Sequence, residues 1–294
     1  MRRTFLIFCL MGAAGLVGAG AQTVTVAGSD LLQAAVSEPL QRYATQNGKD
    51  WKVDLSGTVP AMAALREGNA QLAIIAIPLS DVLPDSKEYT VIKFCFQVDY
   101  ILVNQANPLK EMDRNQLVGV FSTGDENITR WEQLHLAGEW TTRPIIALST
   151  STDDGVVVEL FKNTLFGHNE FKPTVQIMKT PTELVKTVVD NPNSLALSGF
   201  DPGNVTVISL SSEQGSAAPG VPKVPFSPTE DNVYSGDYPL RLPFYLVFKP
   251  ADKARVSELV KLLLGNEFAG HLKAQHYMPV TETFRNHSAL ELDK

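Results

Sequence analysis

Three short polar segments carry the residues best suited to hold a small ligand. They are Gly28-Ser29-Asp30, Ser56-Gly57-Thr58 and the segment 76–81. The first of them lies between a strand-like run, residues 23–27, and a helix-like run that begins at Leu31. Unpaired N–H groups and the helix dipole both favour an anion at such a helix N-terminus. The segments therefore indicate ligand binding through hydroxyl and backbone N–H groups.

The runs around these segments alternate between strand and helix character. After the first strand, the pattern predicts a helix at Leu31–Gln46, a strand at Trp51–Leu55, a helix at Ala61–Glu67 and a strand at Leu72–Ala76. Such alternation predicts a parallel sheet covered by helices on both faces. Ligands in these folds bind beyond the carboxyl ends of the strands, and all three polar segments lie there.

The rest of the chain repeats this pattern around one loop-rich stretch. A strand covers residues 98–104, and a second alternating region begins near residue 117. It continues through strand 144–148, helix 155–165, strand 174–178, helix 182–190 and strand 194–198. Residues 211–239 are rich in Ser, Gly and Pro and predict a long loop. A strand at 242–248 and helices at 253–264 and 267–275 follow.

Residues 1–21 have the pattern of a secretory signal peptide cleaved near Ala21. Arg2 and Arg3 precede an apolar stretch, which is shorter than the roughly 20 residues that span a bilayer. The chain has a formal net charge of −7, and cleavage would remove two positive charges. Such acidity, with no Lys/Arg cluster, argues against a nucleic-acid partner. Cys95 would then be the remaining cysteine, in an apolar run that predicts a buried, inert thiol.

The order and spacing of several stretches resemble the phosphate-binding branch of the solute-binding proteins of ABC importers. Besides the three polar segments, Val120–Gly124 with Ile128–Trp131 resembles a family motif, as do Tyr238–Tyr245 and His276–Val280. This resemblance covers residues 23–285. It implies an α/β, two-lobed periplasmic binding fold, in which each lobe is a mainly parallel sheet flanked by helices and two crossovers form hinges.

The resemblance also implies a division of the chain and a place for the ligand. Lobe 1 would contain residues 22–101 and 245–294, and lobe 2 would contain residues 102–244, including the loop-rich 211–239. The hinges would lie near 100–104 and 238–245. Closure of the lobes around a ligand in the cleft between them is the motion that this layout supports.

Several side chains that hold phosphate in the family are replaced in this sequence. Asp30 and Leu31 stand where the family supplies a hydroxyl and a backbone N–H. Ala76 stands in place of the aspartate that accepts the proton of bound phosphate, and the family's arginine is replaced around Ser149-Thr150. Because the site loses an arginine and gains carboxylates, its local charge opposes a dianion. The substitutions predict that the protein does not hold phosphate by the family mechanism and that its ligand is a different one.

The resemblance and the residue types together give the predicted site. The predicted ligand-binding residues are Ser29, Asp30, Leu31, Ser56, Gly57, Thr58, Ser149, Thr150, Asp154 and Gly155. Asp30 and Asp154 suit a cation or an amine, although either could instead cap the helix that follows it. No catalytic residue, metal ligand or cofactor is predicted, because the five histidines have no metal-ligand spacing and no G-x-S-x-G motif occurs.

Two functions remain open at this stage. The first is an exported, periplasmic solute-binding protein that takes a small molecule or ion and works with an inner-membrane ABC permease. The second is a degenerate binding fold that serves as an interaction or signalling partner of other envelope proteins, without a small-molecule ligand. An enzyme is the least supported class.

Overall fold

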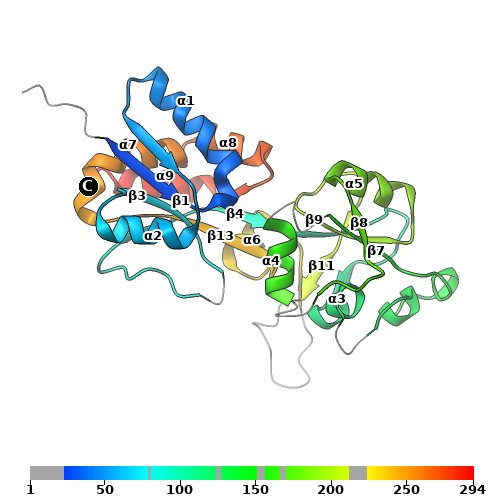
Figure 1. Ribbon diagram of the computed structural model, residues 1–294. Coiled ribbons are helices and arrows are strands. Elements are labelled where there is room, and N and C mark those ends of the chain that lie inside the picture. Colours follow the sequence, from blue (N-terminus) through cyan, green and yellow to red (C-terminus); the bar gives the residue numbers. More distant parts are fainter. Residues whose placement is uncertain (1–22, 79–80, 124–126, 151–155, 166–169, 212–223) are drawn as a thin grey trace, which may run out of the picture.

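The polar loops and strands of the first half lie in a two-lobed α/β molecule (Figure 1). A computed structural model describes residues 23–78, 81–123, 127–150, 156–165, 170–211 and 224–294. The predicted signal peptide, residues 1–21, lies outside the described residues. Among the helices that the structure describes, none combines the length and hydrophobicity needed to cross a bilayer.

The first lobe is built on a six-stranded sheet. Its strand order is β14 (Met278–Pro279), β4 (Thr90–Val98), β13 (Arg241–Phe248), β3 (Leu72–Ala76), β1 (Val24–Gly28) and β2 (Trp51–Asp54). β1 pairs in parallel with β2 and β3, whereas β13 runs antiparallel to β3 and β4. The carboxyl ends of the three parallel strands therefore meet at one edge, as the alternating pattern predicts.

Helices cover both faces of this sheet. Those of the first lobe are α1 (Glu38–Gln46), α2 (Thr58–Glu67), α7 (Lys253–Leu264), α8 (Asn266–Ala274) and α9 (Glu282–Glu291). The largest cluster of buried side chains joins α1, α7 and α8 to one face, and a smaller cluster around Leu65 joins α2 to the other. Cys95, on β4, is fully buried as predicted, and desolvation raises the pKa of its thiol.

A second lobe contains a five-stranded sheet and a small three-stranded one. The larger sheet has the order β10 (Thr206–Val207), β5 (Tyr100–Val103), β9 (Ser194–Ser198), β7 (Ile146–Thr150) and β8 (Gln176–Met178). The smaller has β12 (Pro225–Phe226), β11 (Ser209–Ser211) and β6 (Glu111–Met112). The helices here are α3 (Arg114–Phe121), α4 (Val156–Leu165), α5 (Pro181–Asp190) and α6 (Glu230–Ser235). The predicted α/β fold class is confirmed.

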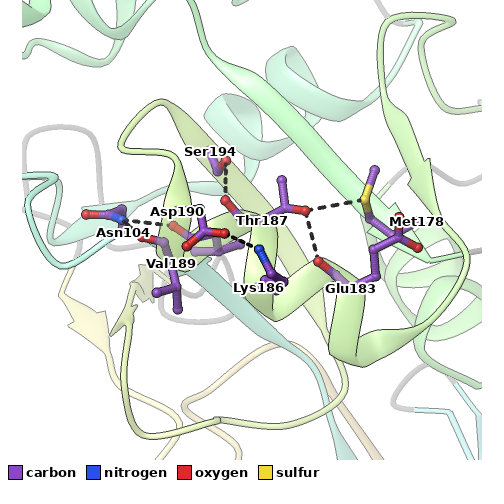
Figure 2. A network of polar contacts seen from close by, with 9 residues as sticks. Asn104, Met178, Glu183, Lys186, Thr187, Val189, Asp190 and Ser194 are labelled. Carbon is purple, nitrogen blue, oxygen red and sulfur yellow. Dashed lines mark hydrogen bonds and ion pairs between the residues drawn. The ribbon is translucent and has the colours of Figure 1, made fainter.

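Asn104, directly after β5, fixes one end of α5 (Figure 2). Its side-chain amide donates to the carbonyl oxygens of Val188 (2.9 Å) and Val189 (2.6 Å), near the C-terminal end of the helix. The other end is capped by Thr180, whose hydroxyl accepts from the N–H of Glu183. These contacts satisfy polar groups that a helix end leaves unpaired.

Two of the predicted segments have a different structure from the one predicted. Residues 31–46 do not form one α-helix: a 3-10 turn at Asp30–Leu32 and a π turn at Gln33–Ser37 precede α1. Pro39 explains the late start of the α-helix, because proline cannot donate to the carbonyl four residues earlier. The predicted loop 211–239 contains β12 and α6, which Thr229 caps through the N–H of Asn232.

Candidate functional site

Hydrogen bonds hold the three predicted loops together at the edge of the six-stranded sheet. The Ser29 N–H donates to the Ile74 carbonyl (2.7 Å), which links the end of β1 to β3. The Gly57 N–H donates to the Gly28 carbonyl (2.8 Å), and the Thr58 hydroxyl accepts from the Ala76 N–H (3.0 Å). The chain ends of β1, β2 and β3 thus form one connected surface.

The first loop uses its serine for helix capping. The Ser29 hydroxyl is buried and accepts from the Leu31 N–H, at 3.4 Å. Asp30 is exposed and lies one residue inside the turn, so it is not the capping residue that the sequence also allowed. The Leu31 carbonyl accepts from the Tyr277 hydroxyl (2.6 Å). Asp30 therefore presents its carboxylate at the surface beside this loop.

The second loop combines a strained backbone with one exposed hydroxyl. Gly57 has φ +134°, which only glycine adopts readily, and α2 follows it without a side-chain cap. Thr58 both accepts from and donates to the backbone of Ala76, so its hydroxyl is used within the protein. Ser56 remains exposed. The first turn of α2 and the Ser56 hydroxyl are the polar groups that this loop offers.

A pocket of about 360 Å³ extends from this surface along α2. Thr58, Met62 and Arg66 line it from the helix, and Ala76 lines it at the end of β3. The segment between residues 81 and 89 closes the opposite wall. Its lining thus includes two of the residues that join the loops.

In the second lobe, Ser149 and Thr150 are buried at the carboxyl end of β7. The Ser149 hydroxyl oxygen has no hydrogen-bond partner among the described residues, and the same holds for Ser122 after α3. Asp154 and Gly155 lie outside the described residues. Among the described residues, no hydrogen bond joins Ser149 or Thr150 to the first-lobe loops, so the predicted residues fall into two groups.

Sequence reasoning missed a buried carboxylate where the chain passes between the two large sheets. Asp99 lies between β4 and β5 and is fully buried. Its N–H donates to the Leu240 carbonyl (3.0 Å), and its carbonyl accepts from the Tyr238 hydroxyl (2.7 Å), so the two crossovers are bonded to each other. Desolvation raises the pKa of Asp99 well above its usual range, and the Gln97 amide opposes this only in part. The sequence feature that could have identified it is a single acidic residue in an otherwise apolar run.

Two basic side chains near this crossover were also missed. Lys93 on β4 is half-buried, and Arg241 at the start of β13 is 8% exposed. Each is a charged residue in an otherwise apolar strand, which is the signal that could have identified them.

Comparison with known proteins agrees with this architecture. No curated protein sequence matches the chain. Its fold is similar to a solved possible phosphate binding protein from Planctomyces limnophilus, with 19% identity, TM-score 0.71, and coverage of 93% of this chain and 98% of that one. PstS from Borrelia burgdorferi gives 15% identity, TM-score 0.69, and coverage of 88% and 99%. An ABC-type phosphate transport receptor from Vibrio cholerae gives 18% identity, TM-score 0.61, and coverage of 87% and 99%.

The resemblance stated from the sequence motifs is confirmed at the level of the family. At these identities the solved structures establish the two-lobed fold and leave the ligand open. A family model described as the PBP superfamily domain matches residues 16–266, which is most of the sequence. The protein therefore belongs to the PBP superfamily.

Proposed function

We propose that this protein is an exported solute-binding protein whose ligand lies in the cleft between the lobes. One observation carries the proposal: hydrogen bonds join the loops after β1, β2 and β3 into one polar surface at the carboxyl edge of the sheet. This is the edge at which open α/β sheets bind ligands. The buried Ser149 hydroxyl, which has no partner among the described residues, supplies a polar group from the second lobe.

The charge of this surface disfavours phosphate binding by the family mechanism and supports a different ligand. Asp30 places an exposed carboxylate beside the first loop, and Ala76 offers a methyl group in place of a proton acceptor. A carboxylate at this position repels an anionic ligand, although solvent and salt reduce the repulsion because Asp30 is exposed. A ligand that carries an amine or another cationic group fits Asp30 better.

The lobes would be residues 23–98 with 241–294, and residues 100–240 between them. This proposed division follows the membership of β4, β5 and β13 in their sheets. An inner-membrane ABC permease would be the partner and the periplasm the location. The similarity of the fold to an ABC-type phosphate transport receptor motivates both proposals.

A thermal-shift screen of residues 22–294 tests the proposal. The panel holds phosphate, sulfate, molybdate, amino acids, polyamines, sugars and divalent cations. A ligand at 100 times its Kd stabilises a protein by about 2.7 kcal/mol, which raises Tm by several degrees at this size. We expect a cationic or amine-bearing ligand to raise Tm, and Asp30→Asn to weaken its binding. The proposal would be contradicted if phosphate raised Tm and this increase disappeared in Ser149→Ala but persisted in Asp30→Asn.

A second candidate function is an interaction partner without a small-molecule ligand. The engagement of Ser29 and Thr58 within the protein favours it, because these hydroxyls are then less available to a ligand. This candidate predicts no Tm shift that depends on Asp30 or Ser149, and specific retention of envelope proteins by the purified chain. A ligand-dependent shift that Asp30→Asn weakens would exclude it.

A further inference from the structure

Two cationic side chains on one face of the six-stranded sheet meet around a phenylalanine ring. The Lys93 Nζ lies 5.8 Å from the centroid of the Phe96 ring, and the Arg241 Cζ lies 5.8 Å from the same centroid. The Lys93 Nζ also lies 4.6 Å from the centroid of the Tyr234 ring on α6. Tyr245 stands opposite Lys93 in the pairing of β13 with β4. The Phe96 ring thus contacts both cations, and the Tyr234 ring contacts the Lys93 ammonium group as well.

Neither cation has a polar partner in the described part of the chain. The Arg241 side chain is more than nine-tenths buried, yet its guanidinium makes no hydrogen bond or ion pair to a described residue, and Nε is fully enclosed. Lys93 likewise contacts only rings through its ammonium group. The Arg241 Nε is an enclosed N–H donor without a partner among the described residues, and leaving a buried donor unpaired is costly. Neither Lys93 nor Arg241 is therefore held by an ion pair with a described acidic residue.

The charges on Lys93 and Arg241 also act against each other. Burial lowers the pKa of Lys93, and the positive charge of Arg241 lowers it further. Asp237 is the acid whose charge acts on Arg241, but it is exposed, is not in an ion pair with Arg241, and accepts from the Ser235 hydroxyl at 2.7 Å. Two cations held together in a partly buried place are electrostatically suited to a ligand with two negative charges.

The end of α6 packs against the guanidinium. Gly236 ends α6 with φ +101°, and a Cβ atom at this residue would overlap the Arg241 Nη2. The helix end therefore packs directly on one side of the guanidinium, and Phe96 packs on another. A planar fork held in this way can bind an oxyanion through two parallel N–H donors.

We propose that Lys93 and Arg241, with the Tyr245 hydroxyl, form a binding site for a small dianionic oxyanion of the phosphate or sulfate type. The site lies on the β4–β13 face beside α6, and none of its residues belongs to the loops after β1, β2 and β3. The proposal of this site does not rest on the ligand proposed for the cleft. Its groups come from the two strands β4 and β13, which border the crossover.

Titration with sodium sulfate and sodium phosphate tests this site, with sodium chloride at matched ionic strength as the control. Tm and calorimetric Kd are measured for the unchanged protein, Lys93→Met and Arg241→Gln. Lys52→Met is the matched control, because Lys52 is an exposed lysine on β2 of the same sheet. We expect saturable binding of both anions to the unchanged protein and to Lys52→Met, and about a tenfold or larger loss of affinity in Lys93→Met.

The test remains decisive if Arg241→Gln fails to fold. Methionine preserves the length of the Lys93 stem between the rings, so Lys93→Met decides the question even if Arg241→Gln fails to fold. Equal affinity in Lys93→Met and the unchanged protein would overturn the proposal, as would the absence of saturable binding. Loss of anion binding in Ser149→Ala with retention in Lys93→Met would also overturn it, because the anion would then belong to the cleft.

Discussion

The His271 Nε2 lies 3.0 Å from the carbonyl oxygen of Ala35 and joins α8 to the segment before α1. In a continuous α-helix this carbonyl would accept from the N–H of residue 39, but residue 39 is proline. A histidine 236 positions away in sequence hydrogen-bonds this carbonyl, to which Pro39 has no N–H to donate. The bond requires the proton on Nε2, because the carbonyl can only accept.

His271→Ala should lower the free energy of unfolding by about 1–2 kcal/mol, because it leaves this carbonyl without its partner. The measurement is urea denaturation at constant pH. His287→Ala is the control, since His287 is exposed on α9. Equal destabilisation by the two substitutions would show that the Ala35 contact contributes nothing.

Asp99→Asn should change how stability depends on pH. The folded protein holds the Asp99 proton to a higher pH than the unfolded chain, because burial raises the pKa of its carboxyl. Its contribution to stability is thus fully present below the unfolded pKa of about 3.9 and is lost as pH rises through the folded value. The slope in this window approaches about 1.4 kcal/mol per pH unit.

Asparagine does not ionise, so the variant should lack this loss and gain stability relative to the unchanged protein as pH rises. Chemical denaturation from pH 4 upwards measures the two curves. Asp237→Asn, at an exposed position, should follow the unchanged protein. Parallel curves for Asp99→Asn and the unchanged protein would show that Asp99 has no raised pKa in the fold.

The sequence predicted best those elements whose signals are local. β3, β9 and α7 have the predicted bounds, because each is an apolar or periodic run that ends at a breaker. α9 was not predicted, and α6 lay within a predicted loop. Both are short and largely polar, and both are stabilised by caps and by packing against distant residues, such as the contact between the rings of Tyr234 and Phe284.

The candidate site shows the same limit. The convergence of the three loops follows from parallel strands, which bring their carboxyl ends to one edge. The use of each hydroxyl could not be predicted, because it depends on tertiary distances. Thr58 bonds to Ala76, which is 18 residues away, and Ser29 rather than Asp30 caps the first turn. The ligand role of every predicted residue, including Asp154 and Gly155, stays a prediction.

Asn104→Ala should destabilise the second lobe by about 1–2 kcal/mol, because two carbonyls at the end of α5 lose their donor. Hydrogen exchange should become faster for the amides of the last turn of α5, whose carbonyls Asn104 binds (Figure 2). Asn69→Ala, which affects an exposed side-chain contact in the first lobe, is the control. Unchanged exchange in α5 would show that the helix end does not depend on Asn104.

Gly236→Ala should be more destabilising than Gly203→Ala, and the comparison separates two causes. Both glycines have positive φ, +101° and +77°, so alanine is strained at either position, by about 1–2 kcal/mol. Gly203 has open space around it, whereas a Cβ at Gly236 meets the Arg241 guanidinium. The additional loss in Gly236→Ala therefore measures how tightly α6 holds Arg241.

Chemical denaturation of the two variants gives this difference directly. If Arg241 is displaced, sulfate should also bind more weakly to Gly236→Ala and unchanged to Gly203→Ala. Equal stability losses and equal sulfate affinities would mean that the guanidinium moves aside freely. The anion site requires that α6 holds Arg241 in place, and this result would contradict that requirement.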